Sequence, residues 1–121
     1  MATVQLTSTD RNSVNGAILF QWDLGNADSG SSFNVPFSAE ITAQITGTFG
    51  SATVVVEGSN DGTNWTTLTK KGGTSAASFT SAGLCTVNEN PAYIRASTSG
   101  GTGSAIKVVV ALHARYSKVN Y

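Results

Sequence analysis

The sequence predicts an all-β protein, an antiparallel β-sandwich or jelly-roll-like domain of seven to eight short strands. Ser, Thr and Gly supply 44 of the 121 residues, a composition typical of tight turns and half-solvated strands. Several segments alternate apolar and polar side chains, and no ten-residue stretch has a convincing helical period. At this length we expect one sandwich domain over residues 16–114, with an N-terminal arm (1–15) and a C-terminal tail (115–121).

The sequence of the first third of the chain predicts one clear β-strand. Residues 1–15 are mostly polar, with a brief alternation at Val4 and Leu6, and indicate an arm or a short edge strand. Residues 17–24 predict a strand whose Ile18, Phe20 and Trp22 side chains pack on neighbours. A loop follows over residues 25–32, and Pro36 then restricts residues 33–37 to a sheet edge or a bend.

The middle of the chain predicts two hairpins. Residues 39–49 alternate cleanly, with one face formed by Ala39, Ile41, Ala43, Ile45, Gly47 and Phe49. Gly50 and Ser51 are placed to turn this strand into an antiparallel pairing with residues 52–57. Asp61 and Gly62 predict a second hairpin, with residues 65–69 as the return strand.

The last third predicts further short strands. Residues 78–80 and 84–87 are strand candidates, and residues 92–98 place Ile94 and Ala96 on one face and Tyr93 and Arg95 on the other. Residues 99–104 are expected to form a hairpin loop into the closing strand, 105–114. One face of that strand carries Ile106, Val108, Val110 and Leu112.

The charge balance argues against two classes of partner. Seven basic and seven acidic residues give no net charge, so neither nucleic acid nor an acidic membrane surface is expected to bind. No run approaches the ~20 apolar residues that a membrane-spanning helix needs. Residues 1–5 have neither a basic nor an apolar region typical of a signal peptide, and there is one cysteine, so we expect a reducing compartment.

No catalytic constellation stands out. His113, the one imidazole, is interpreted as a solvated or structural strand residue, and Cys85 as a packing residue. Glu40 and Glu57 flank the first predicted hairpin, but nothing singles out an acid–base pair. The loop over residues 60–64 has oxygen donors without an acidic cluster, which favours a turn over a calcium site. We therefore predict a protein that is not an enzyme and needs no cofactor or metal.

The aromatic residues divide into core and contact candidates. Trp22, Phe49 and Trp65 are expected to fill the core. Aliphatic, aromatic and basic residues in the terminal segments are better placed for contacts between molecules. The candidate intermolecular contacts are Val4, Leu6, Arg11, Arg115, Tyr116 and Tyr121.

Two stretches carry a resemblance to a known group of proteins. Residues 45–65, and residues 90–95 with Gly100–Gly103 and the closing strand to Ala114, resemble small β-sandwich virion proteins of tailed bacteriophages. These include capsid decoration (cement) proteins. The resemblance implies a non-enzymatic structural protein that binds the major capsid protein as a homotrimer. It also implies synthesis in the bacterial host cytoplasm, a final place on the capsid surface, and an N-terminal arm that extends to a capsid subunit or to a neighbouring copy.

A second resemblance supports an alternative. Residues 58–65 (Gly-Ser-Asn-Asp-Gly-Thr-Asn-Trp) and the Tyr93-Ile94-Arg95 strand are similar to discoidin-type carbohydrate-binding modules. This chain is short for that family and lacks the cysteine pair of many extracellular members. The alternative function is therefore a carbohydrate-binding module or a tail or fibre component that binds a receptor. Its candidate glycan contacts are Asn64, Trp65 and Tyr93.

Overall fold

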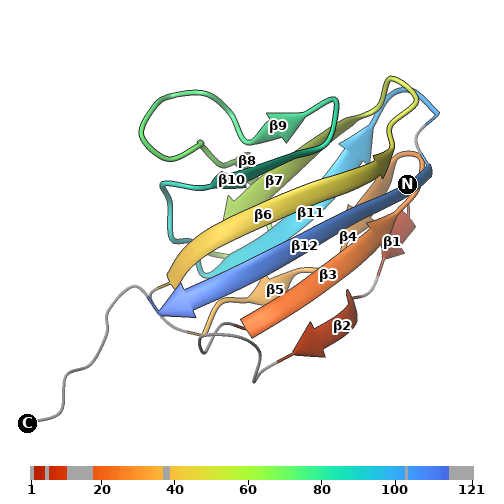
Figure 1. Cartoon of the computed structure of the whole chain (residues 1–121). Coiled ribbons are helices and arrows are strands. Elements are labelled where there is room, and N and C mark those ends of the chain that lie inside the picture. The colour runs from red at the N-terminus through yellow and green to blue at the C-terminus, as the bar shows by residue number, and fades with distance from the viewer. Residues whose placement is uncertain (1, 5, 11–17, 37–38, 103, 115–121) are drawn as a thin grey trace, which may run out of the picture.

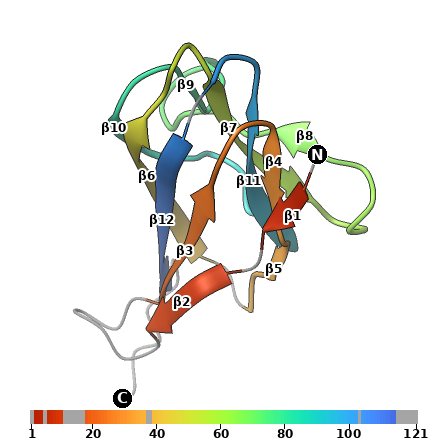
Figure 2. The ribbon, with the colours of Figure 1, turned by 90° about the vertical axis from the view of Figure 1, so that its right-hand side faces the viewer.

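Two β-sheets packed face to face form the protein (Figure 1). The structure is a computed structural model that describes residues 2–4, 6–10, 18–36, 39–102 and 104–114. Within those ranges there are twelve strands and no helix, and Figure 2 shows the two layers from their edges. The predicted all-β sandwich is confirmed. The strands outnumber the expected seven to eight because several of them span only two to five residues.

The first sheet has five strands, all paired antiparallel. Its central strand, β12, pairs with β6 on one side and with β3 on the other. In spatial order the strands are β10 (Gly83–Thr86), β6 (Ala39–Thr48), β12 (Ser104–Ala114), β3 (Ile18–Leu24) and β2 (Leu6–Asp10).

The second sheet has seven strands around the long pair β7 and β11. Its path runs through β1 (Ala2–Val4), β4 (Asp28–Gly30), β11 (Tyr93–Ser99), β7 (Thr53–Ser59) and β8 (Thr66–Thr67). Two further short strands complete it: β5 (Phe33–Asn34) pairs with β11, and β9 (Ser78–Phe79) pairs with β7. The β1–β4 pair is parallel, and the remaining pairs are antiparallel.

The core lies between the sheets and follows the predicted alternation. The predicted inward residues of β12 have no exposed surface: Ile106, Val108, Val110 and Leu112. Phe20 and Trp22 of β3 are equally buried, and their rings meet edge to face with centroids 5.2 Å apart. The Trp22 indole N–H donates a hydrogen bond of 2.8 Å to the Ser31 carbonyl oxygen, so the buried polar end of this ring is satisfied.

The predicted hairpin between residues 39–49 and 52–57 is wrong, because β6 and β7 belong to different sheets. The turn at Gly50 and Ser51 instead carries the chain from one sheet to the other. The predicted hairpin at 99–104 is wrong for the same reason, since β11 and β12 also lie in opposite sheets. Alternation identifies the buried face of a strand but not its hydrogen-bonded partner. Two strands that face each other across a core show the same alternation as two strands paired in one sheet.

The two crossing turns pack against each other. The Thr102 N–H donates a hydrogen bond of 2.8 Å to the Gly50 carbonyl oxygen. A Cβ at Gly101 would lie 2.3 Å from that same oxygen, and both glycines have positive φ (53° at Gly50, 62° at Gly101). The glycines therefore allow two backbones to approach more closely than any larger residue would permit.

The inward face of β6 ends earlier than its sequence predicts. Ala39, Ile41, Ala43 and Ile45 are buried, but Gly47 is exposed and Phe49 only half-buried. Gly47 has a φ of 128°, and it lies where the β6–β12 register shifts between Ser104 and Lys107. This irregularity interrupts the period of two, so the predicted position of Gly47 on the buried face is wrong.

Parts of the N-terminal segment form an edge strand on each sheet. Val4 lies opposite Gly30 in the parallel β1–β4 pair, and Leu6 lies opposite Trp22 in the β2–β3 pair. The edge-strand interpretation therefore holds for β1 and β2. The other candidate contact residues, Arg11, Arg115, Tyr116 and Tyr121, lie outside the described residues.

The predicted Asp-Gly hairpin is confirmed, with Gly58 of β7 opposite Thr66 of β8.

Candidate functional site

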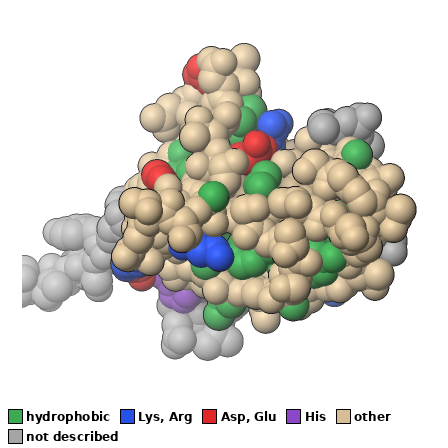
Figure 3. All heavy atoms as spheres, turned by 90° about the horizontal axis from the view of Figure 1, so that it is seen from above, with side chains coloured by type: hydrophobic (Ala, Val, Ile, Leu, Met, Phe, Trp, Pro, Cys, Tyr) green, Lys and Arg blue, Asp and Glu red, His purple; other side chains and the backbone are tan. Residues whose placement is uncertain are grey.

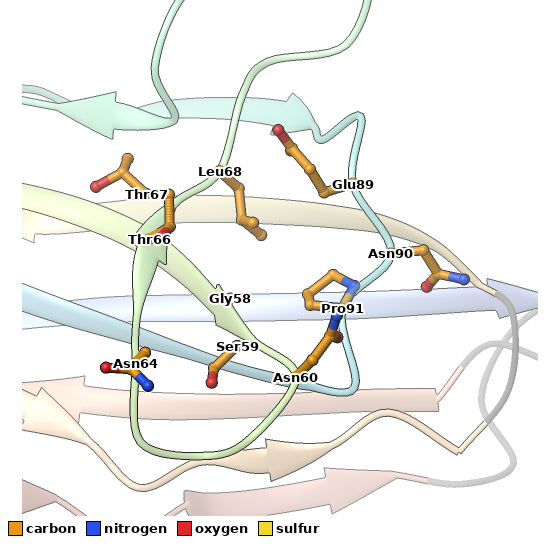
Figure 4. A pocket seen from close by; sticks show the side chains of 10 residues that line it. All are labelled: Gly58, Ser59, Asn60, Asn64, Thr66, Thr67, Leu68, Glu89, Asn90 and Pro91. Atoms are coloured by element: carbon orange, nitrogen blue, oxygen red, sulfur yellow. The ribbon is translucent and has the colours of Figure 1, made fainter.

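A groove of about 330 Å³ lies at one end of the seven-stranded sheet. It is bounded by the loop that follows β7, by β8, and by the segment that leads into β11 (Figure 4). We call it the β7–β8 groove. Its lining residues are Gly58, Ser59, Asn60, Asn64, Thr66, Thr67, Leu68, Glu89, Asn90 and Pro91.

Gly58 allows the two apolar residues of the groove to meet. A Cβ on Gly58 would lie 2.6 Å from Cγ of Pro91 and 2.7 Å from Cδ2 of Leu68. Leu68 is only 4% exposed, so it has little room to move aside. The groove therefore has an apolar base of Leu68 and Pro91, set close together over a strand that has no side chain at this point.

The loop of the first wall is held in shape by one carboxylate. Asp61 accepts hydrogen bonds of 2.8 Å from the backbone N–H groups of both Thr63 and Asn64. It also accepts bonds from the Asn64 side-chain amide at 2.7 Å and from the Ser59 hydroxyl at 2.9 Å. The backbone bonds, and then the side-chain bonds, hold the pKa of Asp61 far below its ordinary value. Asn64 is thereby fixed at the edge of the groove.

The opposite wall is tied to the same loop and to the segment that follows β8. The Ala92 N–H donates a hydrogen bond of 2.9 Å to Oδ1 of Asn60, which joins the two walls. Glu89 accepts bonds from the Thr69 N–H at 2.9 Å and from the Thr69 hydroxyl at 2.7 Å. Burial opposes ionisation of Glu89, but the Thr69 hydrogen bonds outweigh it and lower the pKa of this carboxyl. Both oxygens of the groove's one carboxylate are therefore already engaged.

A cluster of aromatic and charged residues lies beside the groove, on the outer face of the same sheet. The Arg95 guanidinium carbon is 4.3 Å from the centroid of the Trp65 ring. Arg95 Nε also donates a hydrogen bond of 2.8 Å to Glu57, which accepts a second bond from the Ser97 hydroxyl at 3.2 Å. The prediction that Trp65 fills the core is wrong: it is half-buried against Arg95, outside the sandwich. Trp22 is in the core as predicted, and Phe49 packs at its margin.

The three predicted glycan contacts gather around the Asp61 loop, and one of them lines the groove. Tyr93 is half-buried, and its ring lies beside Gly62, where a Cβ would be 3.7 Å away. Asn64 lines the β7–β8 groove, whereas Trp65 and Tyr93 do not. The sequence missed the groove's other residues, although it predicted the turn at Asp61 and Gly62 in one wall. Nothing in a single sequence indicates that this turn meets the segment that leads into β11.

The residues weighed for catalysis are dispersed. His113 is exposed and lies opposite Glu40 in the β12–β6 pair, while Glu40 forms an ion pair with Lys71. Glu57 lies in the other sheet, so the two glutamates do not form a pair. Burial raises the pKa of the half-buried Cys85 thiol, with Lys70 acting weakly in the opposite direction. Among the described residues, no three His, Cys, Asp or Glu side chains are grouped to hold a metal.

The part of the chain described by the structure contains no helix that is long and apolar enough to cross a membrane. The proposed absence of enzymatic activity, cofactor and nucleic-acid partner stays a prediction. The fold and the groove define a small β-sandwich protein with a mostly polar depression at the end of one sheet.

Comparison with known proteins supports this description of the fold. No family model and no curated protein sequence matches the chain. Among solved structures, SPBc2 prophage-derived protein YomS is similar, with a TM-score of 0.63 and 16% identity over 88% of this chain and 96% of that one. At this identity the likeness shows a shared fold.

Two further solved structures are more distant. A cupin domain from Bordetella pertussis Tohama I has a TM-score of 0.47 and 8% identity, over 88% of this chain and 91% of its own. A carbohydrate-binding module from Cellvibrio mixtus lichenase 5A, in complex with cellotriose, has a TM-score of 0.34 and 10% identity, over 93% and 91% of the two chains. Similarities this weak support no inference about function.

Proposed function

We propose that this chain is a non-enzymatic structural protein of a bacteriophage particle, and specifically a decoration protein that binds the major capsid protein on the head. One observation carries the proposal: the fold is shared, over nearly the whole of both chains, with a prophage-derived protein. The resemblance of residues 45–65, 90–95, 100–103 and the closing strand to Ala114 to small virion proteins points in the same direction.

The charge distribution suits a subunit that packs densely on a shell. The chain carries seven basic and seven acidic residues, and on the face seen in Figure 3 charged side chains of both signs are scattered among uncharged ones. Large fields of one sign would make crowded copies repel each other, and this surface has none in that view. A closed homotrimer would present three equal capsid contacts, whose effects combine through effective concentration.

Two measurements test this proposal. We expect the full chain to have the mass of a trimer in light scattering after gel filtration, and to co-sediment with heads assembled from the major capsid protein of the same phage. A monomer at high concentration that also fails to co-sediment with heads would contradict the decoration role. Recovery of the chain from purified tails, and not from heads, would reject decoration and keep the structural role in the particle.

A second candidate function is carbohydrate recognition, either as a binding module or within a receptor-binding tail or fibre component. It is favoured by the β7–β8 groove, in which Asn64, one of the sequence-predicted glycan contacts, is held in place by Asp61. Reproducible binding of the full chain on a glycan array would support this function. An array without binding, using protein shown to be folded, would reject it.

A further inference from the structure

We propose that the β7–β8 groove is a binding site for a neutral saccharide of one or two sugar rings. The proposal rests on the second candidate function, carbohydrate recognition, and is independent of where in a phage particle the chain lies. It assigns the site to the groove at the end of the sheet and not to the Trp65–Arg95 cluster on the sheet's outer face.

The charges of the groove select against ionised ligands. None of the ten lining residues is Lys, Arg or His. Glu89 is the one carboxylate, and both of its oxygens accept hydrogen bonds from Thr69. A bound anion would lie beside this carboxylate without a cation to compensate it, and a bound cation would have to compete with Thr69 for its oxygens. A neutral polar ligand meets neither cost.

The remaining polar groups match sugar hydroxyls. Thr66 and Thr67 line one wall of the groove, and within the part of the chain described by the structure their hydroxyls make no hydrogen bond. Asn64 contributes an amide whose nitrogen donates to Asp61, which leaves its carbonyl oxygen as an acceptor for a ligand. Hydroxyl and amide groups both donate and accept, as sugar hydroxyls do, so the two sets are complementary.

The base of the groove complements the other side of a sugar ring. Pro91 provides apolar surface between the two polar walls, and the buried Leu68 supports it from below where both residues meet over Gly58. A pyranose ring has C–H groups on its faces and hydroxyls around its rim, so a ring lying on these residues would direct its hydroxyls toward Asn64 and Thr66. The groove thus combines a small apolar base with polar walls that would fix the orientation of a bound ring.

The size and rigidity of the groove fit a small ligand. Its volume of about 330 Å³ is at the lower end of the ~300–1,000 Å³ usual for small-molecule sites. The Asp61 bonds fix the loop of one wall, and the bond from Ala92 to Asn60 joins it to the other. Binding would therefore order few protein groups, which lowers the entropic cost of forming the complex.

The neighbouring aromatic cluster is less suited to stacking on a sugar. The Arg95 guanidinium lies over the Trp65 ring, where a pyranose would otherwise stack, and Glu57 holds Arg95 there. Tyr93 lies against the Gly62 turn. Replacing Trp65 therefore separates the two possible locations of a carbohydrate site.

The test is an NMR titration of the isotope-labelled full chain with cellobiose, maltose, lactose and N-acetylglucosamine, and with glucuronic acid as a charged comparison. We expect a neutral sugar to shift the amide signals of Asn64, Thr66 and Leu68, with glucuronic acid binding more weakly. Thr66→Val removes one hydroxyl and should weaken binding by about 3- to 10-fold. Thr66→Tyr narrows the groove and should weaken it by more than about 10-fold.

Thr46→Tyr is the matched control, because Thr46 is also an exposed strand threonine but lies in the five-stranded sheet. It should bind as the unchanged protein does, and Trp65→Ala should retain binding if its spectrum remains dispersed. No binding of any neutral sugar by the folded, unchanged protein would overturn carbohydrate recognition together with the groove. Binding that survives both Thr66 substitutions but is lost in folded Trp65→Ala would overturn the groove alone. Preference for glucuronic acid would overturn the neutral ligand class.

Discussion

The guanidinium of Arg95 lies over the indole of Trp65, with its central carbon 4.3 Å from the ring centroid. Arg95 belongs to β11, and Trp65 directly precedes β8, so this contact fastens the Asp61 loop to the outer face of the sheet. Glu57 of β7 also binds Arg95, accepting a hydrogen bond of 2.8 Å from its Nε. The contact thus connects three segments that are separate in the sequence.

Trp65→Ala should lower the free energy of unfolding by about 1–2 kcal/mol, because it removes a half-buried ring and its cation–π contact. Trp65→Phe, which keeps a ring under Arg95, should lower it by less. Urea denaturation of the three proteins measures the difference. Equal stabilities of Trp65→Ala and the unchanged protein would show that the contact contributes nothing.

The two tryptophans should differ in their fluorescence. Trp22 is fully buried and hydrogen-bonded, whereas Trp65 is half-buried at the surface. In the Trp65→Phe variant the remaining emission should lie at shorter wavelength and be quenched less by acrylamide than that of the unchanged protein. The complementary Trp22→Phe variant, which retains Trp65, should be quenched more strongly. Stronger quenching of Trp22 than of Trp65 would contradict the burial of Trp22 in the core.

Gly30→Ala should destabilise the protein, because a Cβ there would lie 2.5 Å from Cδ1 of the buried Trp22 ring. Overpacking of this kind costs about 1–3 kcal/mol. Gly73→Ala is the matched control: a Cβ at Gly73 meets nothing within 4 Å, and Gly73 is not among the positive-φ glycines. Thermal unfolding should show a lower Tm for Gly30→Ala and little change for Gly73→Ala. Equal Tm values would contradict the close approach of Gly30 to Trp22.

Asp61 should titrate far below the ordinary Asp pKa of about 3.9, because backbone N–H groups of Asn64 and Thr63 donate to its ionised form. A pKa that is lower in the folded state means that the carboxylate favours folding above the unfolded-state pKa. This contribution declines as the pH falls toward the folded-state pKa. NMR titration of the Thr63 and Asn64 amide signals measures it, and a midpoint near 4 would contradict the hydrogen-bonded loop. In Asp61→Asn these signals should lose their dependence on the carboxyl titration.

Cys85 should react slowly with thiol reagents. Burial raises its pKa, which reduces the fraction of reactive thiolate at neutral pH, and Lys70 offsets this only in part. At pH 8 the rate of alkylation by iodoacetamide should be below that of glutathione, and it should reach the rate of an exposed thiol in denaturant. A faster reaction in the folded protein would indicate an activated cysteine.

Strand alternation predicted much of the fold because the burial of a strand residue depends on a local period of two. It identified the inward residues of β12 and of β3, Trp22 among them. It did not identify strand partners, as the two incorrect hairpins show. The alternation of a strand is the same whether the next strand pairs with it in one sheet or faces it across the core. The Gly47 irregularity was also hidden, since it arises where β6 meets β12.

The sequence by itself therefore determined the fold class, the Asp61 turn and the inward faces of the long strands, all of which follow from short-range patterns. Only the tertiary structure decided that β6 and β7 face each other across the core, that Trp65 lies outside it on Arg95, and that Asn64 shares a groove with Pro91. Each of these depends on contacts between segments far apart in the chain, and those contacts are selected by how the two sheets pack as a whole.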